Sequence, residues 1–259
     1  MKEIPKIKVT LLGTGTSQGV PLIGCSCAVC LSQDKRDKRL RSSVLLTING
    51  ENFVIDAGPD FRQQMLSCRV DRLRAILITH EHVDHIFGLD DIRSYNWIQK
   101  RPTDIYAEHR VQVAIRHIFH YVFASDNYPG IPQMELHRIS ESPFIIDDIV
   151  FTPIRGYHHN LPVLGFRVGN FTYMTDVNSI PVHEMEKIKG TKVLVINALR
   201  KERHLSHFSL DEALKISEEL KPEQTFLTHI SHALGVYNDV EKNLPEGVSL
   251  AYDGLSFEV

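Results

Sequence analysis

Short apolar runs separated by polar loops recur along the chain, and they predict many strands with helices between them. Such runs, bounded by polar or turn residues, are typical of buried strands. Strands are predicted at residues 7–12, 44–48, 53–55, 75–78, 149–151, 165–168, 171–174, 193–196 and 225–228. Asn49-Gly50 separates two of these runs, which predicts a tight hairpin there.

Two other segments have the spacing of helices. Between Val111 and Phe123, apolar residues recur every three or four positions, which predicts a helix with one face in the core. A second helix is predicted from Leu210 to Leu220, because Ser209 followed by Glu212 forms a capping box. With no linker, repeat or low-complexity tract in view, strands and interspersed helices predict one layered α/β domain over residues 1–259.

Two polar stretches complete this outline. Residues 124–133 contain two prolines and a glycine, which predicts a loop and a candidate lid. The charged run from Lys35 to Arg41 predicts a solvated face.

Composition narrows the classes of protein. The chain has 259 residues and a net charge of −3, which argues against nucleic acid or an anionic membrane as a partner. No run is long and apolar enough to span a membrane, and residues 1–6 lack the apolar core of a signal peptide. We therefore expect a cytoplasmic protein. Histidine is unusually frequent, with fourteen in the chain.

The densest cluster of these histidines directly follows the predicted strand at 75–78. His80, His82, Asp84 and His85 place three imidazoles and one carboxylate within six residues. Imidazole and carboxylate are ligands for divalent metal ions, and burying four such groups unpaired would cost several kcal/mol. The cluster therefore predicts a metal-dependent hydrolase.

Metal sites collect ligands from several strand ends, so further ligands are expected among the histidine and aspartate residues that lie just after predicted strands. Four places qualify: His158-His159, Asp176, the pair His204 and His207, and His229.

Three of the four cysteines lie together as Cys25, Cys27 and Cys30. In a reducing compartment, thiols this close are typical of metal ligands, and three thiolates need a fourth donor to close a tetrahedral zinc site. Cys68 lies apart, on the same predicted helical face as Phe61 and Met65, and is expected to be packed in the core.

The ordered histidines and aspartates resemble those of the metallo-β-lactamase superfamily, whose fold is an αββα sandwich. Within it, the chain looks most like the PhnP-type phosphodiesterases, which cleave phosphoribosyl cyclic phosphate. The similarity lies in residues 13–21, in Gly24-Cys25-x-Cys27-x-x-Cys30, in residues 161–166 and in Thr175-Asp176. Ribonuclease Z enzymes are a more distant resemblance.

This resemblance implies a ligand set. One divalent ion would be held by His80, His82 and His158, and a second by Asp84, His85 and His229, with Asp176 bridging both. His159 is the alternative to His158. The two catalytic ions would be manganese or zinc. Cys25, Cys27, Cys30 and His232 would hold one structural zinc.

The resemblance also implies a reaction on a small phosphodiester. Asp84 and Asp176 would orient the attacking water, and His207 in His207-Phe208-Ser209 would protonate the leaving alkoxide, with His204 as the alternative donor. Competing readings are a ribonuclease Z-like enzyme, a lactonase or β-lactamase that uses the same ions, and a non-enzymatic metal-bound scaffold or sensor. A homodimer would be compatible with the family.

Overall fold

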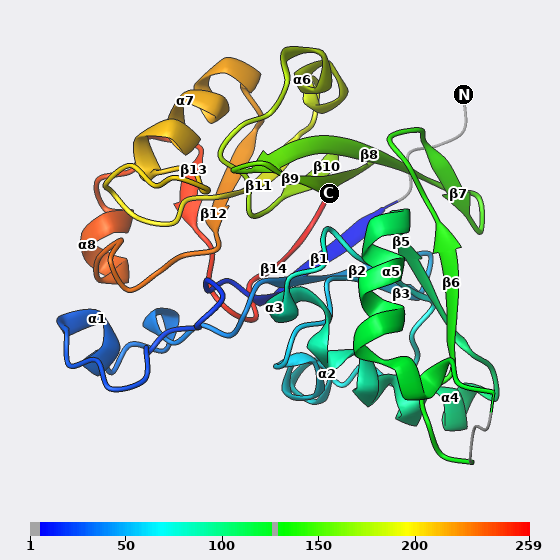
Figure 1. Ribbon diagram of the computed structural model, residues 1–259. Coiled ribbons are helices and arrows are strands. Elements are labelled where there is room, and N and C mark those ends of the chain that lie inside the picture. The colour runs from blue at the N-terminus through cyan, green and yellow to red at the C-terminus, as the bar shows by residue number, and fades with distance from the viewer. Residues whose placement is uncertain (1–5, 126–128) are drawn as a thin grey trace.

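Two facing sheets form the centre of the protein, as the computed structural model shows for residues 6–125 and 129–259 (Figure 1). Within the described residues each sheet has seven strands. In order across the first sheet these are β14 (Ser256–Glu258), β1 (Ile7–Gly13), β2 (Ser43–Ile48), β3 (Glu51–Ile55), β4 (Ala75–Leu77), β5 (Thr103–Ala107) and β6 (Met134–Arg138). The second runs β13 (Val248–Leu250), β12 (Gln224–Thr228), β11 (Val193–Asn197), β10 (Phe171–Met174), β9 (Leu161–Val168), β8 (Ile149–His158) and β7 (Phe144–Ile146).

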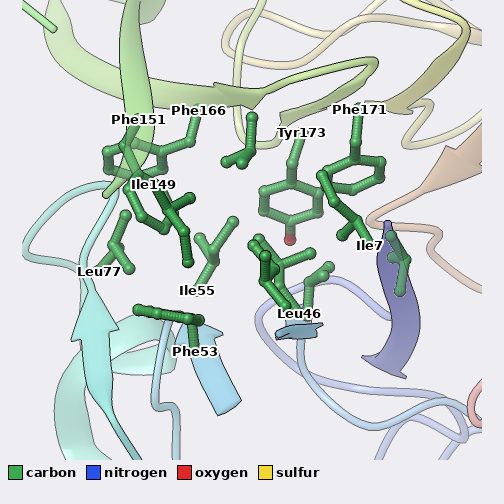
Figure 2. Close-up of a cluster of buried hydrophobic side chains, with 14 of the residues drawn as sticks. Ile7, Leu46, Phe53, Ile55, Leu77, Ile149, Phe151, Phe166, Phe171 and Tyr173 are labelled. Carbon is green, nitrogen blue, oxygen red and sulfur yellow. The ribbon is translucent and has the colours of Figure 1, made fainter. Parts of the chain in front are cut away.

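Apolar side chains from both sheets meet between them and form the central core (Figure 2). The rings of Phe53 from β3 and Phe151 from β8 lie 5.4 Å apart, which joins the two sheets directly. The predicted strands supply this core because their apolar runs are buried between two layers.

Helices cover the outer faces of both sheets (Figure 1). The first sheet is covered by α2 (Phe61–Cys68), α3 (Val83–Ile86), η2 (Phe87–Ile92), α4 (Arg93–Gln99), α5 (His109–Ile118) and η3 (His120–Val122), and the second by α6 (Val182–Ile188), α7 (Leu210–Leu220) and α8 (Tyr237–Glu241). The short helices α1 (Ala28–Leu31) and η1 (Lys35–Asp37) lie in the cysteine-containing loop region. The αββα sandwich predicted from the sequence is confirmed. In the described part of the chain, no helix is both long enough and apolar enough to cross a membrane.

Two local predictions, one of a hairpin turn and one of a helix cap, are confirmed. Asn49 and Gly50 both have positive φ, 53° and 84°, and they join β2 to β3 as the hairpin that their sequence predicts. Helix α7 begins at Leu210 with the Ser209–Glu212 capping box formed in both directions. The other predicted helix is shorter than expected, since α5 ends at Ile118 and its apolar stripe continues in η3.

The solvated face predicted for Lys35–Arg41 is wrong at two positions. Asp37 is 1% exposed, and its carboxylate accepts hydrogen bonds from the Ser32 hydroxyl and from the Tyr237 backbone N–H. Arg39 is 4% exposed and donates to the Ala251 carbonyl at 2.5 Å. Partners that are 200 and 212 residues away in the sequence, Tyr237 and Ala251, therefore help to bury these charges. Of the candidate lid at residues 124–133, residues 126–128 lie outside the described residues.

Parallel pairing brings the ends of several strands to one edge of the sandwich. In the first sheet β3 is parallel to β4, and in the second β10, β11 and β12 are parallel to one another. Asp56 follows β3, and His80 follows β4. Asp176 follows β10, and His229 follows β12. Because the carboxyl ends of parallel strands share an edge, this topology gathers all four side chains.

Candidate metal centre

A polar cavity of about 370 Å³ opens at this edge of the sandwich. Its walls are formed by Ser17, Glu81, His82, Val83, Asp84, His158, Asp176, His207 and His229. His80 and His85 lie beneath it with no solvent exposure. The structure thus collects at one place all seven residues predicted to hold the catalytic metal ions.

The residues expected at the first ion are in mutual contact. Nε2 of His80 lies 3.0 Å from Nδ1 of His82, and the rings of His82 and His158 lie 5.2 Å apart. Nδ1 of His158 is buried and has no hydrogen-bond partner within the described residues. The facing nitrogens of His80 and His82 fit a shared cation. A ring nitrogen of His158 lies within 4.8 Å of a carboxylate oxygen of Asp176 and a ring nitrogen of His207.

The residues expected at the second ion surround His85. Its Nε2 lies 3.2 Å from Asp84 Oδ2 and 3.0 Å from Asp176 Oδ2. The ring of His229 is stacked parallel to that of His85, with centroids 6.3 Å apart. These nitrogen and oxygen donors fit a divalent ion of the zinc, manganese or iron type.

Asp176 lies between the two groups. Its Oδ1 is 2.6 Å from His229 Nδ1, and its Oδ2 is 3.7 Å from His80 Nε2. Asp176 and His229 have φ values of 56° and 54°, in the left-handed region that side chains rarely adopt. Asn197 holds the Asp176 loop through two hydrogen bonds with the backbone of Val177. Residues strained and anchored in this way are typical of functional sites.

Asp56, which follows β3, supports the centre from behind. The Thr79 hydroxyl lies 2.9 Å from Asp56 Oδ2 and 2.9 Å from Nδ1 of His80. This chain of contacts leaves Nε2 of His80 directed toward the cavity side of the cluster. Gly58 lies close to the same loop, since a Cβ there would be 1.9 Å from the Asp84 carbonyl oxygen.

The side chains of the centre differ in the direction in which their pKa values are shifted. Burial, and then His85, lower the pKa of His80 well below its usual value. Burial alone would lower the pKa of His85, but Asp176, Asp56 and Asp84 together raise it well above the usual value. Burial likewise opposes ionisation of Asp176, yet His229 and His85 hold its pKa well below the normal range. The centre therefore contains ionised carboxylates that can attract a cation.

The structure separates His158 from His159. His158 lines the cavity, whereas His159 is exposed at the β8–β9 turn with φ of 56°. The backbone N–H of His159 donates to the Asn178 side chain at 2.8 Å. His158 is therefore the geometrically suited candidate ligand.

The two candidate proton donors occupy different positions. His207 lines the cavity, and its Nε2 lies 3.9 Å from Asp176 Oδ2. His204 lies in an adjoining hollow of about 260 Å³, and its Nδ1 is 3.2 Å from Nδ1 of His207. The Phe208 N–H donates to the Val177 carbonyl at 2.8 Å, which ties the His207 loop to that of Asp176. Burial first, and then His229, lower the pKa of His207 to about 3.

The second predicted cluster is also assembled. The sulfur atoms of Cys25, Cys27 and Cys30 and a ring nitrogen of His232 all lie within 4.8 Å of one another. Nδ1 of His232 is 3.3 Å from Cys25 Sγ and 3.4 Å from Cys27 Sγ. The Cys30 N–H and then His232 lower the pKa of Cys27 to about 6. Three sulfurs and one imidazole match the donors of a closed zinc site.

Three further residues, Ser17, Glu81 and Val83, line the cavity and were not predicted as site residues. Glu81 stands between two candidate ligands, so its place in the cluster was a usable signal. Ser17 reaches the cavity from the loop after β1, and its signal was its place within residues 13–21, one of the segments that resemble the family.

Comparison with known proteins places this arrangement in a family. Residues 51–230 match the family described as "Beta-lactamase superfamily domain". The chain belongs to this superfamily. The crystal structure of a diphosphatase from the PhnP family is similar over 98% of this chain and 97% of its own, with 39% identity and a TM-score of 0.92. The predicted PhnP-type member of the superfamily and the predicted metal-dependent hydrolase are thereby confirmed.

Curated relatives carry more varied names. An octanoyltransferase of Porphyromonas gingivalis is 40% identical over 252 residues, which are 96% of this chain and 51% of that protein. The chain thus spans about half the length of that relative. A ribonuclease Z of Methanococcus maripaludis is 25% identical over 258 residues, or 96% of this chain and 68% of that protein.

Proposed function

We propose that this chain is a dinuclear metal-dependent phosphodiesterase that hydrolyses a small, cyclic phosphate diester, with phosphoribosyl 1,2-cyclic phosphate as one candidate. The observation that carries the proposal is the position of His207. Its ring closes the cavity wall beside Asp176, and it belongs to neither of the predicted ligand groups. A proton donor at that place serves a reaction whose leaving group is an alkoxide.

The residues present fit the metal ions that the superfamily uses. In the arrangement that the family resemblance implies, one ion would be held by His80, His82 and His158, the other by Asp84, His85 and His229, and Asp176 would contact both. Manganese and zinc both suit these donors. When bound, such a pair supplies charge neutralisation at the phosphate and a lowered pKa for water.

The remaining steps fall to side chains of this chain. Asp84 and Asp176 place carboxylate oxygens at the cavity surface, where they can orient a water molecule toward phosphorus. The negative charge of a bound phosphate diester would raise the pKa of His207 from the low value that burial and His229 impose, so that the ring could give a proton to the departing oxygen. His204 would hold the ring of His207 through the 3.2 Å contact. His232 of the structural zinc site lies three residues after His229 in the sequence. That site would therefore keep the His229 loop beside the cysteine loop.

The similar proteins support phosphorus–oxygen chemistry. The 39% identical structure is that of a diphosphatase, which favours a diphosphate bond as the second candidate target. The ribonuclease Z relative favours a phosphodiester bond, which is also a phosphorus–oxygen bond. The octanoyltransferase name describes a protein about twice this length, and acyl transfer can reside in the half that this chain does not match.

The test is a substrate panel with the purified chain and added manganese. Bis(p-nitrophenyl) phosphate, a cyclic sugar phosphate, a dinucleoside diphosphate, a precursor tRNA and a lactone would be assayed in parallel. We expect turnover of the first two and loss of that turnover in His82→Ala, with unchanged circular dichroism. Lactone hydrolysis without diester hydrolysis would contradict the proposal, as would a near-normal rate in His82→Ala. Absence of turnover on every substrate by the metal-loaded chain would favour a metal-bound scaffold or sensor.

A further inference from the structure

Arg110 lies near the metal centre without being one of its candidate ligands. It is the second residue of α5, a helix fixed to the core by Val111 and Ile115. Its Nη1 pairs with the carboxylate of Glu81, and its Nη2 donates to the carbonyl oxygen of Pro162. One planar guanidinium therefore holds two segments that are about 80 residues apart, because its N–H groups point in fixed directions.

The first of these segments carries two candidate ligands. Glu81 stands between His80 and His82 and lines the reaction cavity. A carboxylate in this position is itself a competent ligand for a divalent cation. Pairing with Arg110 withholds it and fixes the backbone on which His82 is mounted.

The second segment carries the ligand that comes from the other sheet. Pro162 of β9 is paired with Tyr157 of β8, and the next pair, Leu161 with His158, closes the hairpin. The same strand contacts the first sheet where the Leu164 N–H donates to the Thr79 carbonyl oxygen at 3.1 Å. Holding the Pro162 carbonyl therefore holds the hairpin end on which His158 stands.

A second ion pair fixes the same end of α5 to β8. Glu108, which precedes the first turn of α5, accepts two hydrogen bonds from the guanidinium of Arg155, a residue only 7% exposed. The start of α5 is thus a rigid reference point between the two sheets. Nε of Arg110 is buried without a hydrogen-bond partner in the described part of the chain, a cost that function can explain more readily than stability.

We propose that Arg110 is a positioning residue: by binding Glu81 and the Pro162 carbonyl together, it sets the separation of His82 and His158 and keeps Glu81 off the metal. This inference rests on the proposed dinuclear centre. Removing the guanidinium frees both segments, so affinity for one of the two ions should fall while the other site is retained.

The test is manganese binding by the full chain, followed by electron paramagnetic resonance of the free ion and of the coupled pair. Manganese suits oxygen and nitrogen ligands and discriminates against the cysteine site. We expect two ions in the wild type and, in Arg110→Met, one of them bound about tenfold more weakly, the size typical for a residue that orients ligands. The coupled-pair signal should weaken accordingly. The lysine in Arg110→Lys can reach only one of the two partners at a time. The manganese affinity of this variant should therefore lie between those of the wild type and Arg110→Met.

Arg116 supplies the matched control, because it lies on the same helix with its guanidinium stacked over Phe123, 4.5 Å from the ring centroid. Arg116→Ala should bind manganese as the wild type does. In a Glu81→Gln background, Arg110→Met should lower manganese affinity by a smaller factor, because the arginine acts partly through the Glu81 carboxylate. Wild-type affinities for both ions in folded Arg110→Met would overturn the proposal; if that variant does not fold, wild-type affinities in Arg110→Lys would do so. A wild-type chain that binds no manganese pair would overturn the proposed function and this inference with it.

Discussion

Asp56 Oδ2 lies 2.7 Å from Nδ1 of His85, and both side chains are fully buried. The carboxylate accepts the Nδ1 proton, so Nε2 is the ring nitrogen that points away from Asp56. That nitrogen faces Asp84 and Asp176 on the cavity side. A carboxylate behind a metal-binding histidine fixes ring orientation and raises ligand basicity.

Replacing this carboxylate should weaken metal binding without removing a ligand. Asp56→Asn presents an amide that cannot accept from both Thr79 and His85 as the carboxylate does. We expect metal affinity to fall about 10–100-fold, as measured by competition with a chromophoric chelator. Asp34→Asn, at the partly buried N-cap of η1, is the control and should bind normally. Unchanged affinity in Asp56→Asn would show that the 2.7 Å contact is not a support for the metal site.

The role of His207 predicts a dependence on the leaving group. His207→Ala should lower kcat about 100-fold or more for a diester with an alkoxide leaving group, which needs a proton. The same variant should lose much less on bis(p-nitrophenyl) phosphate, because p-nitrophenolate departs without one. His204→Ala should show a weaker version of this pattern, since His204 contacts His207 rather than the main cavity. Equal losses on both substrates would instead assign His207 to metal binding.

The cysteine cluster should contribute to stability through one zinc ion. Cys30→Ser removes a donor from the cluster, so we expect loss of one zinc per chain and a decrease in Tm of about 5 °C or more. Cys68→Ser is the matched control, because Cys68 lies outside the cluster and should leave the zinc content unchanged. Calorimetry with elemental analysis on the same samples measures both quantities. Full zinc content in Cys30→Ser would contradict the assignment.

A cluster far from the cavity predicts a pH dependence of stability. Asp104 accepts from His137 at 2.6 Å, from Arg74 at 2.6 Å and from Arg101 at 2.9 Å. Partial burial would raise its pKa, but His137, Arg101 and Arg74 together lower it. A carboxyl whose folded-state pKa is lowered stabilises the fold above its unfolded pKa of about 4, and this stabilisation is lost as pH falls through the folded value.

Urea unfolding of the wild type and Asp104→Asn from pH 7 to pH 3 tests this dependence. The wild type should be more stable by about 1–3 kcal/mol at pH 7, because the variant keeps the cations without their counter-charge. The difference should shrink below pH 4. A difference that grows toward low pH would have the wrong sign for a lowered pKa.

Much of this arrangement could be predicted because the relevant signals are local. The Ser209–Glu212 cap and the Asn49-Gly50 turn act within a few residues, and both form as their sequence predicts. The candidate ligands were found because each follows an apolar strand. The strand register then brings those ends together.

Features that depend on distant partners escaped sequence reasoning. No strand was predicted at Thr103–Ala107 or Met134–Arg138, because polar residues interrupt the first and the second contains no fully buried residue. Arg39 is buried through contacts with residues near the other end of the chain. Arg110 contacts Glu81 beside the first sheet and the Pro162 carbonyl in the second sheet. No spacing along the sequence encodes this pair of contacts.

Metal counting on the purified wild type and two variants tests the central claim most directly. Elemental analysis after saturation and removal of free ions should give three ions per chain in the wild type. It should give two in Cys30→Ser and at most one besides the cysteine-bound zinc in Asp176→Ala, which lacks the carboxylate between the two groups. A wild type that holds only the cysteine-bound ion, or an Asp176→Ala chain that still holds all three, would contradict a dinuclear centre at this edge of the sandwich.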